Sequence, residues 1–325
     1  MDDGQLTGMR YGWIGIGRMG AALVERLLDA GCDVAVYNRT RAKADLLAER
    51  GATVVDSPAD LADRDVVFTM VGGPGDFTEV VLGAGGLLSR EDVAPRIIVD
   101  STTISPEASQ EVREHAEQRG VALLAAPVSG NPKVVASGRL SVVVSGPQDA
   151  WEEVRPVLHL FGRQITYVGE GERARLAKIC HNVMLGVVSQ CLAEIVVLAE
   201  KGGMSRADFL DFLNDSVMGS VFTRYKSPAL VGLDFTPTFT PELLRKDFDL
   251  GFEAAHRLDV PMPVAAAAAQ AVQALLGHGY GDLDFAALLD QTAKASGLEL
   301  KPEDVEVDDG LSPLEGVAAP AGDAR

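Results

Sequence analysis

The sequence predicts an α/β protein, with a doubly wound parallel sheet followed by an all-α second domain. From Tyr11 to about Val168, short apolar runs alternate with longer amphipathic ones, which is the pattern of βαβ units around a parallel sheet. A glycine-rich turn separates the first apolar run from the first helical stretch. After Gly171 the strand-like alternation ends, and the pattern stays helical to about residue 300.

The predicted elements of the first domain are short and regularly spaced. After a first strand at Tyr11–Ile14, the runs that predict strands are Val34–Tyr37, Asp65–Val71, Arg96–Asp100 and Val121–Ala126. Between them, Met19–Ala30 and Arg41–Arg50 carry apolar residues at helical spacing, with charges on the opposite face.

The second domain is predicted to begin with one long helix, Arg173–Lys201, which is apolar almost all round and therefore expected to be buried. Further helical patterns, separated by Gly and Pro, are Ala207–Leu213, Pro241–Leu258 and Val264–Leu276. We expect a disordered N-terminus over residues 1–10, the α/β domain over 11–170, the helical domain over 171–300 and a disordered acidic tail over 301–325.

Composition indicates a folded protein without nucleic-acid or membrane partners. The 325 residues carry a net charge of −18, and such a chain is repelled by nucleic-acid phosphates and anionic membrane surfaces. No apolar run is expected to span a bilayer, and the first residues do not resemble a secretory signal. Three cysteines without regular spacing indicate free, mostly buried thiols in a reducing compartment. We expect a cytoplasmic enzyme.

The glycine-rich turn has the G-x-G-x-x-G spacing of a Rossmann dinucleotide site, between a strand and a helix. Its glycines permit the tight turn and a close approach to a pyrophosphate, while the helix N-terminus provides amide donors to the phosphates. The predicted cofactor-binding residues of this loop are Gly15, Ile16, Gly17, Arg18, Met19 and Gly20.

The end of the second strand predicts which dinucleotide binds. A Rossmann domain that prefers NAD has an acidic residue there, which binds the ribose 2′-hydroxyl. This chain has Asn38, Arg39 and Thr40. Asn38 and Thr40 can hydrogen-bond a 2′-phosphate, and Arg39 can neutralise it. The prediction is NADP(H) in preference to NAD(H), although Arg39 on a solvated helix start is the simpler alternative.

From residue 11 to about 295 the chain resembles the β-hydroxyacid dehydrogenase family. The resemblance begins with Gly12–Gly20 and continues with Asp100–Pro106, where the family places a threonine beside the cofactor, which corresponds to Thr103. Val71 and Gly72, at the end of a predicted strand, complete the expected cofactor-binding set in the first domain. The family includes 3-hydroxyisobutyrate dehydrogenases, tartronate semialdehyde reductases and glyoxylate or succinic semialdehyde reductases.

A third segment, Ala126–Gly130, resembles the substrate-binding signature of the family. The resemblance implies that Ser129 and the Gly130 amide receive a small anionic substrate, and a serine-glycine turn after a strand is a natural anion site. The chain departs from the family pattern at Ala125, where an aspartate is usual, and at Asn131-Pro132, which replaces a second glycine and its neighbour. Asn131 is predicted to add a polar contact to the substrate.

The fourth segment, Lys178–Asn182, lies in the long predicted helix. Lys178 and Asn182 are four residues apart and therefore share a helix face. In the family the matching lysine is catalytic and the matching asparagine positions the substrate. His181 replaces the first of two usual asparagines and should point elsewhere. The glycines before Lys178 lie earlier than is usual, which leaves the register of the helix start open.

The resemblance also implies a mechanism. Lys246, in a lysine-aspartate pair, would approach the cofactor, unless it is only a surface charge. Lys178 would donate a proton to the substrate oxygen during reduction and accept one during oxidation. The histidines show no metal-ligand spacing, so no metal is predicted. Ser216–Lys226 is a candidate lining of the substrate pocket.

Two other functions stay open at the level of sequence. Imine reductases share the Asn-Arg-Thr strand end and the two-domain plan, but typically have another residue at the position of Lys178. A non-catalytic NADPH-binding protein is the second alternative, because fold alone does not determine function. Family members bury the long-helix region between subunits, so we expect a homodimer or a tetramer.

Overall fold

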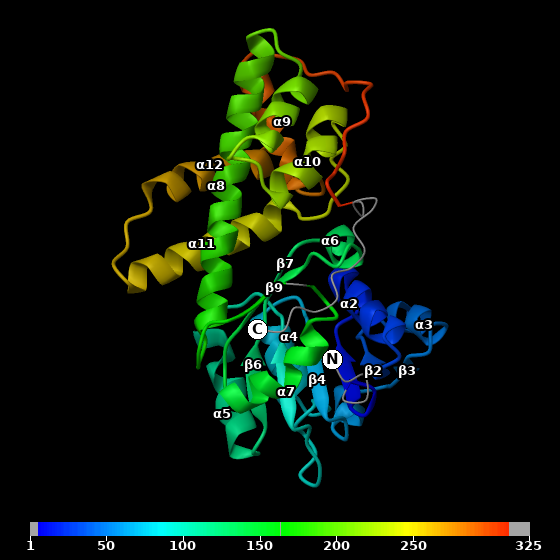
Figure 1. The fold of residues 1–325 in the computed structure, drawn as a ribbon. Helices are drawn as coiled ribbons and strands as arrows, with labels where there is room; N and C mark the ends of the chain where they lie inside the picture. Colours follow the sequence, from blue (N-terminus) through cyan, green and yellow to red (C-terminus); the bar gives the residue numbers. More distant parts are fainter. Residues whose placement is uncertain (1–5, 163, 312–325) are drawn as a thin grey trace. The chain divides into compact units, whose positions relative to one another are not determined.

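The computed structural model describes residues 6–162 and 164–311, and the chain forms two compact units, Met1–Cys180 and His181–Arg325 (Figure 1). The division between the units falls inside the long helix α8, Arg173–Lys201. The predicted boundary at residue 171 lies before this helix. The predicted boundary is earlier because the sequence pattern changes from alternating to helical where α8 begins. The first turns of α8 are nevertheless bonded to the sheet unit.

Unit 1 contains a parallel six-stranded sheet in the order β3-β2-β1-β4-β5-β6. The strands are β1 Arg10–Ile14, β2 Asp33–Tyr37, β3 Thr53–Val54, β4 Val66–Thr69, β5 Ile97–Asp100 and β6 Ala122–Ala125. The residues of β4 and β5 are buried throughout, as expected of parallel strands covered on both faces. The strand order reverses between β1 and β4, and the loops after such strands bind nucleotides in Rossmann sheets. The predicted fold class is confirmed.

Amphipathic helices connect these strands. They are α2 Arg18–Asp29, α3 Arg41–Ala48, η1 Pro58–Leu61, α4 Pro74–Leu82, η2 Glu107–Ser109 and α5 Gln110–Gln118. One core cluster joins Phe77 and Val81 of α4 and Val112 of α5 to Ile14 and Ile98 of the sheet. Burial of this apolar surface holds the helix starts in place at the carboxyl ends of the strands.

A second, three-stranded sheet follows, which the sequence pattern did not predict. It consists of β7 Val128–Ser129, β8 Ser141–Val144 and β9 Gln164–Tyr167. β7 pairs antiparallel with β8, and β8 pairs parallel with β9. Helices α6 Pro132–Ala136 and α7 Gln148–Leu158 lie between these strands in sequence. Strands of two to four residues are too short to show a clear period, which is why the pattern missed them.

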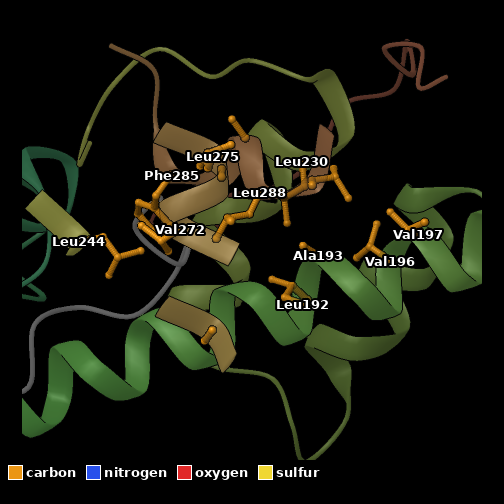
Figure 2. Packing of buried hydrophobic residues seen from close by; sticks show 14 of the residues in the cluster. Leu192, Ala193, Val196, Val197, Leu230, Leu244, Val272, Leu275, Phe285 and Leu288 are labelled. Carbon is orange, nitrogen blue, oxygen red and sulfur yellow. The ribbon is translucent and has the colours of Figure 1, made fainter. Parts of the chain in front are cut away.

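Over its described residues, 181–311, unit 2 contains helices and no strands, as predicted. After α8 it contains α9 Arg206–Asp215, α10 Val221–Gly232, α11 Pro241–Arg257, α12 Pro263–Gly277, η3 Phe285–Ala287 and α13 Leu288–Ala295. Leu192 and Val196 of α8 belong to one apolar cluster with Leu230, Leu275 and Leu288 from later helices (Figure 2). The second half of α8 is therefore a core helix of this unit.

Helix α8 is less buried than its composition predicts. Leu176, Met184 and Leu198 are 36%, 67% and 72% exposed. Cys180 and Cys191 are also exposed, and among the three cysteines only Cys32 is buried. By length and composition alone α8 could cross a membrane, which corrects the expectation that no apolar run has that length. A core helix meets the same criterion, and packing in unit 2 covers the apolar face of α8 that carries Leu192 and Val196.

Both ends of the described chain have a more defined course than predicted. Arg10 opens β1 and donates its backbone N–H to Asp65 over 2.8 Å. Residues 301–311 were expected to be disordered, but the Glu303 carboxylate accepts the backbone N–H groups of Arg206 and Ala207 over 2.8 and 3.0 Å. These bonds cap the N-terminus of α9, where a negative charge is favourable. Residues 1–5 and 312–325 lie outside the described residues.

Candidate functional site

The glycine loop lies between β1 and α2, and two of its glycines are required by close packing. Gly15 has a φ of +101°, and a Cβ atom there would overlap the carbonyl oxygen of Met70. A Cβ atom at Gly20 would overlap the carbonyl oxygen of Gly15. Gly17 differs, because no described atom lies within 4 Å of its hypothetical Cβ. Gly17 therefore leaves open space at the N-terminus of α2, where a pyrophosphate would fit.

Asn38, at the end of β2, holds this loop. Its Oδ1 accepts the backbone N–H of Ile16 over 2.8 Å, and its Nδ2 donates to the carbonyl oxygen of Thr40 over 2.9 Å. The sequence predicts a direct contact with a 2′-phosphate, for which only the Nδ2 group can be the donor. The side-chain oxygen joins the glycine loop to the second strand.

Arg39 and Thr40 are exposed beside Asn38. The Arg39 guanidinium forms an exposed ion pair with Asp76 of α4, with 3.2 Å between Nη1 and Oδ1. Such a pair contributes little to stability because water screens it. Arg39 is thus held at the carboxyl edge of the sheet by a weak interaction that a phosphate can replace.

The loops after β4 and β5 are tied together by Asp100. Its Oδ1 accepts the hydroxyl groups of Thr69 and Thr102, each over 2.6 Å. The Thr102 hydroxyl in turn accepts the backbone N–H of Val71 over 3.2 Å. These bonds position Val71, which precedes the exposed Gly72, and the half-buried Thr103.

The predicted anion site follows β6 and enters the small sheet. Ser129 ends β7, opposite Ser141 of β8. Gly130 has a φ of +141°, and a Cβ atom there would lie 2.8 Å from Val134. The Oδ1 of Asn131 accepts the backbone N–H of Val134 over 3.1 Å. Asn131 therefore caps α6, and its side-chain oxygen is already engaged in the fold.

Lys178 is half-buried in the second turn of α8. The chain enters the helix through Gly169 and Gly171, whose φ angles are +97° and +72°. Ser145, after β8, donates its hydroxyl to the carbonyl oxygen of Gly171 over 2.8 Å and accepts the backbone N–H of Ala174 over 3.0 Å. These bonds hold the first turn of the helix, which begins at Arg173. Lys178, in the next turn, belongs to unit 1.

The remaining predicted residues belong to unit 2. The Nδ2 of the buried Asn182 donates to Asp247 Oδ2 over 2.6 Å. Lys246 Nζ lies 3.9 Å from Asp247 Oδ1, so the structure brings these predicted residues together. His181 Nδ1 lies 2.9 Å from Asn182 Oδ1. We expected His181 to point away from Asn182. The structure corrects this expectation, because the imidazole of His181 contacts the amide oxygen of Asn182.

The sheet order and the loops around its switch point define a Rossmann-type dinucleotide-binding protein. The model of the NAD-binding domain of 6-phosphogluconate dehydrogenase matches residues 10–169, and that of the NAD-binding domain of NADP-dependent 3-hydroxyisobutyrate dehydrogenase matches residues 172–292. The chain belongs to the β-hydroxyacid dehydrogenase family. It binds a pyridine nucleotide and acts on CH–OH groups.

Relatives match the chain over most of its length. Glyoxylate/succinic semialdehyde reductase 1 of Arabidopsis thaliana is 31% identical over 283 residues, which is 87% of this chain and 98% of the relative. A solved 3-hydroxyisobutyrate dehydrogenase of Mycobacterium tuberculosis with L-serine is 29% identical, covers 87% of this chain and 98% of its own, and has a TM-score of 0.75. Psf3, solved with NADP+ and 2-OPP, is 26% identical, covers 86% and 99%, and has a TM-score of 0.78.

The glycine loop allows a prediction that separates binding from folding. Gly17→Ala should weaken NADPH binding by about 10- to 100-fold, since a methyl group that intrudes on a packed ligand costs about 1–3 kcal/mol. The melting temperature without cofactor should hardly change, because the free protein has room for that methyl. Gly20→Ala should lower the melting temperature as well. Fluorescence titration with NADPH and thermal unfolding without it test both variants, and equal losses of stability would contradict the assignment.

Sequence reasoning missed the partners of the predicted residues. The sequence indicates Asp247 only as the aspartate beside Lys246, and it gives no predicted role to Arg175 within the apolar helix. A signal existed for Arg175, since a charged residue on the buried side of a helix requires a counter-charge. Nothing in the local sequence indicated that Asp100 is this counter-charge.

Proposed function

We propose that the protein is an NADP(H)-dependent reductase and dehydrogenase of small 3-hydroxy acids and the corresponding semialdehyde or aldehyde acids, with Lys178 as general acid and base. The observation that carries the proposal is the start of α8. Arg175 Nη1 lies 2.7 Å from Asp100 Oδ2, at the carboxyl end of β5. The helix that bears Lys178 is thereby joined to the edge of the sheet where nucleotides bind.

The described residues fit a bound dinucleotide. Gly17 leaves space at the N-terminus of α2, and the amide groups there are donors for phosphate oxygens. When bound, the nicotinamide supplies the hydride for reduction and accepts it for oxidation. The protein then has to hold the substrate and manage one proton on its oxygen.

Lys178 donates that proton in reduction and accepts it in oxidation. In reduction, its ammonium group donates a proton to the carbonyl oxygen as the carbon gains the hydride, and the resulting amine regains a proton from water. In oxidation, the neutral amine accepts the hydroxyl proton. Ser129 and the Gly130 amide hold the carboxylate of the substrate. Asn182, four residues after Lys178 on the same helix, is the proposed contact to the reacting oxygen. The buried Asp247 fixes the direction of the Asn182 amide by accepting one of its N–H groups.

A substrate panel tests the proposed function. We expect oxidation of NADPH, followed by absorbance, with glyoxylate or succinic semialdehyde, substrates that are named for the Arabidopsis thaliana relative. Cyclic imines and neutral aldehydes serve as controls for the imine reductase alternative. Turnover of imines alone would replace the proposal, and NADPH binding without turnover of any compound would favour a non-catalytic role.

The proposed NADP(H) preference predicts the effect of Arg39→Asp. Loss of one charge-assisted bond to the 2′-phosphate costs about 1.5–3 kcal/mol, which corresponds to about a 10- to 100-fold rise in the KM for NADPH. The KM for NADH should change far less, because NADH lacks that phosphate. Arg50→Asp is the matched control, since Arg50 is also exposed and paired with acidic residues, but follows the far end of α3. An unchanged ratio of the two KM values would contradict the preference.

We also propose a homodimer formed through an apolar stripe on α8, with a tetramer as the next larger form. The stripe consists of Leu176, Cys180, Met184, Cys191 and Leu198, all exposed. Their spacing of four or seven residues places them on one face of the helix, away from Lys178 and Asn182. A row of exposed apolar side chains is costly unless another surface covers it.

The stripe predicts the outcome of a charge introduced at its centre. Met184→Glu should shift the protein to a monomer, because the dimer would bury an unpaired carboxylate. Light scattering after size-exclusion chromatography measures the mass. Phe212→Glu is the control, since Phe212 is 69% exposed on α9, outside the stripe. A monomeric parent protein would contradict the proposed dimer.

A further inference from the structure

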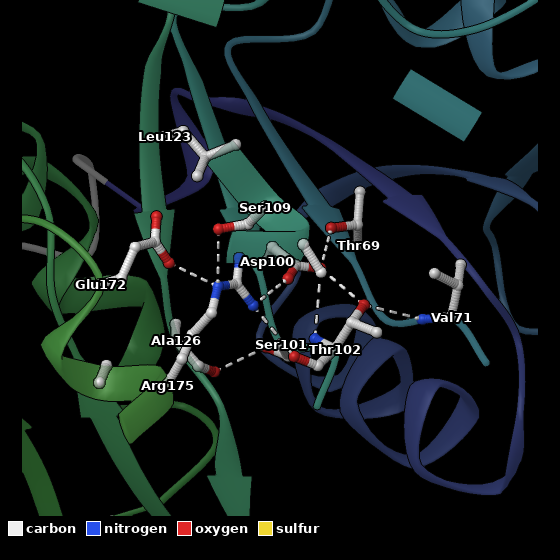
Figure 3. A network of polar contacts seen from close by, with 12 residues as sticks. Thr69, Val71, Asp100, Ser101, Thr102, Ser109, Leu123, Ala126, Glu172 and Arg175 are labelled. Carbon is white, nitrogen blue, oxygen red and sulfur yellow. Dashed lines mark hydrogen bonds and ion pairs between the residues drawn. The ribbon is translucent and has the colours of Figure 1, made fainter. Parts of the chain in front are cut away.

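A buried polar network lies at the carboxyl ends of β4 and β5, and it reaches into the first turn of α8 (Figure 3). Its centre is the ion pair between Asp100 and Arg175, which are 0% and 1% exposed. Ions are expensive to transfer from water into a protein interior, and a well-packed apolar pair is often at least as stable. Stability alone is therefore a poor explanation for this pair, and its geometry points to another role.

On one side, the pair is bonded to the predicted cofactor loops. Asp100 accepts hydrogen bonds from Thr69 and Thr102, and Thr102 accepts the backbone N–H of Val71. Arg175 Nη1 also donates to the carbonyl oxygen of Thr102 over 3.1 Å. Thr102 is thus held through both its side chain and its backbone, directly before Thr103.

On the other side, the pair is bonded to the start of α8. Arg175 Nε donates to Glu172 Oε2 over 2.6 Å and to Ser109 Oγ over 3.2 Å. Glu172 forms a second ion pair with Arg113, whose Nη1 donates to the carbonyl oxygen of Leu123 over 2.9 Å. The helix start therefore has bonds to η2, α5 and β5, and Arg113 extends the network from α5 to β6. It cannot rotate or slide without breaking several buried charged contacts.

Lys178 follows Arg175 by three residues, so the two side chains lie about one helical turn apart on α8. A displacement of the Arg175 guanidinium would therefore displace the Lys178 amine. We infer that the Asp100–Arg175 pair is a positioning device that sets Lys178 against the cofactor loops. Asp100 and Arg175 act through Lys178 and Thr102 and do not themselves take part in proton transfer. This inference rests on the proposed role of Lys178.

The test uses Arg175→Gln and the double variant Asp100→Asn/Arg175→Gln. The single variant leaves Asp100 without its counter-charge and should lower stability strongly. The double variant replaces both charges by amides that can still hydrogen-bond, which preserves the fold for measurement. With NADPH and succinic semialdehyde, both variants should lose about 100-fold in kcat, the effect of misplacing a reacting group by about 1 Å. The KM for NADPH should change by less than about threefold.

Arg206→Gln is the matched control. Arg206 is also fully buried and paired, with Glu200 at 2.7 Å, and it donates to the carbonyl oxygens of Leu230 and Val231 in unit 2. This variant should lower the melting temperature while kcat stays near that of the parent protein. An equal loss of kcat in Arg206→Gln would show that the effect of Arg175 is only a loss of stability.

Hydrogen exchange provides a readout that does not depend on turnover. In the parent, NADPH should slow exchange both in the loops at residues 71–73 and 101–103 and in the first turns of α8. In the double variant, protection of the loops should remain, whereas protection of α8 should be lost. Unchanged protection of α8 would overturn the inference. If the parent turns over no substrate, the proposed function fails, while this experiment still decides whether the pair couples the two segments.

Discussion

Lys178→Ala should reduce kcat by about 10²–10⁴-fold, the range that a positioned general acid contributes. The substitution removes the group that protonates the substrate oxygen, so the negative charge that develops there during hydride transfer has no proton donor. Binding of NADPH should persist, because the glycine loop and Arg39 are formed by other segments. Steady-state kinetics and fluorescence titration with NADPH measure these two effects separately.

Lys201→Ala is the control for this experiment. Lys201 is the last residue of the same helix, and its Nζ donates to the carbonyl oxygen of Ser296 over 2.7 Å. Loss of that exposed contact should leave kcat unchanged. Activity of Lys178→Ala within about tenfold of the parent would exclude the lysine as the proton donor.

Asp284→Asn should destabilise unit 2 by about 3–5 kcal/mol at neutral pH, because it removes the negative charge of the carboxylate bonded to the buried Lys226 ammonium. Lys226 Nζ lies 2.6 Å from Asp284 Oδ1, and the two residues are 5% and 1% exposed. Asp284 Oδ2 also accepts the hydroxyl and backbone N–H of Thr238, over 2.6 and 2.9 Å. Urea unfolding of both proteins measures the difference.

The loss of stability caused by Asp284→Asn should depend on pH. Burial alone would raise the pKa of Asp284, but Lys226 and the hydrogen bonds from Thr238 and Ala286 outweigh it and hold the pKa below its ordinary value of 3.8. A carboxylate whose pKa is lowered by folding stabilises the native state above its unfolded pKa, and this contribution is lost as the pH falls through the folded pKa. The stability difference between parent and Asp284→Asn should therefore be constant from pH 8 to pH 5 and shrink below about pH 4.

Asp290→Asn serves as the control for the buried pair. Asp290 forms an ion pair with Lys294 over 2.7 Å, but the Lys294 side chain is 64% exposed. Water screens this pair, so its loss should have a small effect. A stability difference for Asp284→Asn that does not shrink in acid would show that packing, and not the charge of Asp284, is responsible.

Part of the candidate site could be predicted because its signals are local. Gly15, Gly17 and Gly20 lie in one turn, and the structure gives separate physical reasons for each of them. Residues 38–40 follow directly from a strand whose end is visible in the pattern. Lys178 and Asn182 are related by helical spacing alone. In each case the relevant neighbours lie within a few residues in sequence, so periodicity and motif spacing are sufficient.

Other features of the site depend on contacts outside the local pattern. Asn38 and Asn131 have the residue types expected at a phosphate or substrate site, yet their side-chain oxygens accept backbone N–H groups at Ile16 and Val134. Whether an amide faces a ligand or the backbone depends on distances of a few tenths of an ångström, which residue type does not encode. The expectation of disorder is wrong for residues 301–311 for a similar reason, because Glu303 caps a helix that is distant in sequence.

The sequence by itself determined the fold class, the division into a sheet unit and a helical unit, and the nucleotide loop, since each follows from periodicity or short spacing. Its resemblance to the family indicated Lys178. Only the tertiary structure decided the buried pairs Asp100–Arg175, Asn182–Asp247 and Lys226–Asp284, whose members are 75, 65 and 58 residues apart. A charged residue in an apolar segment indicates that a partner must exist. Which residue becomes that partner depends on the strands and helices that packing brings together, and a local pattern does not contain that information.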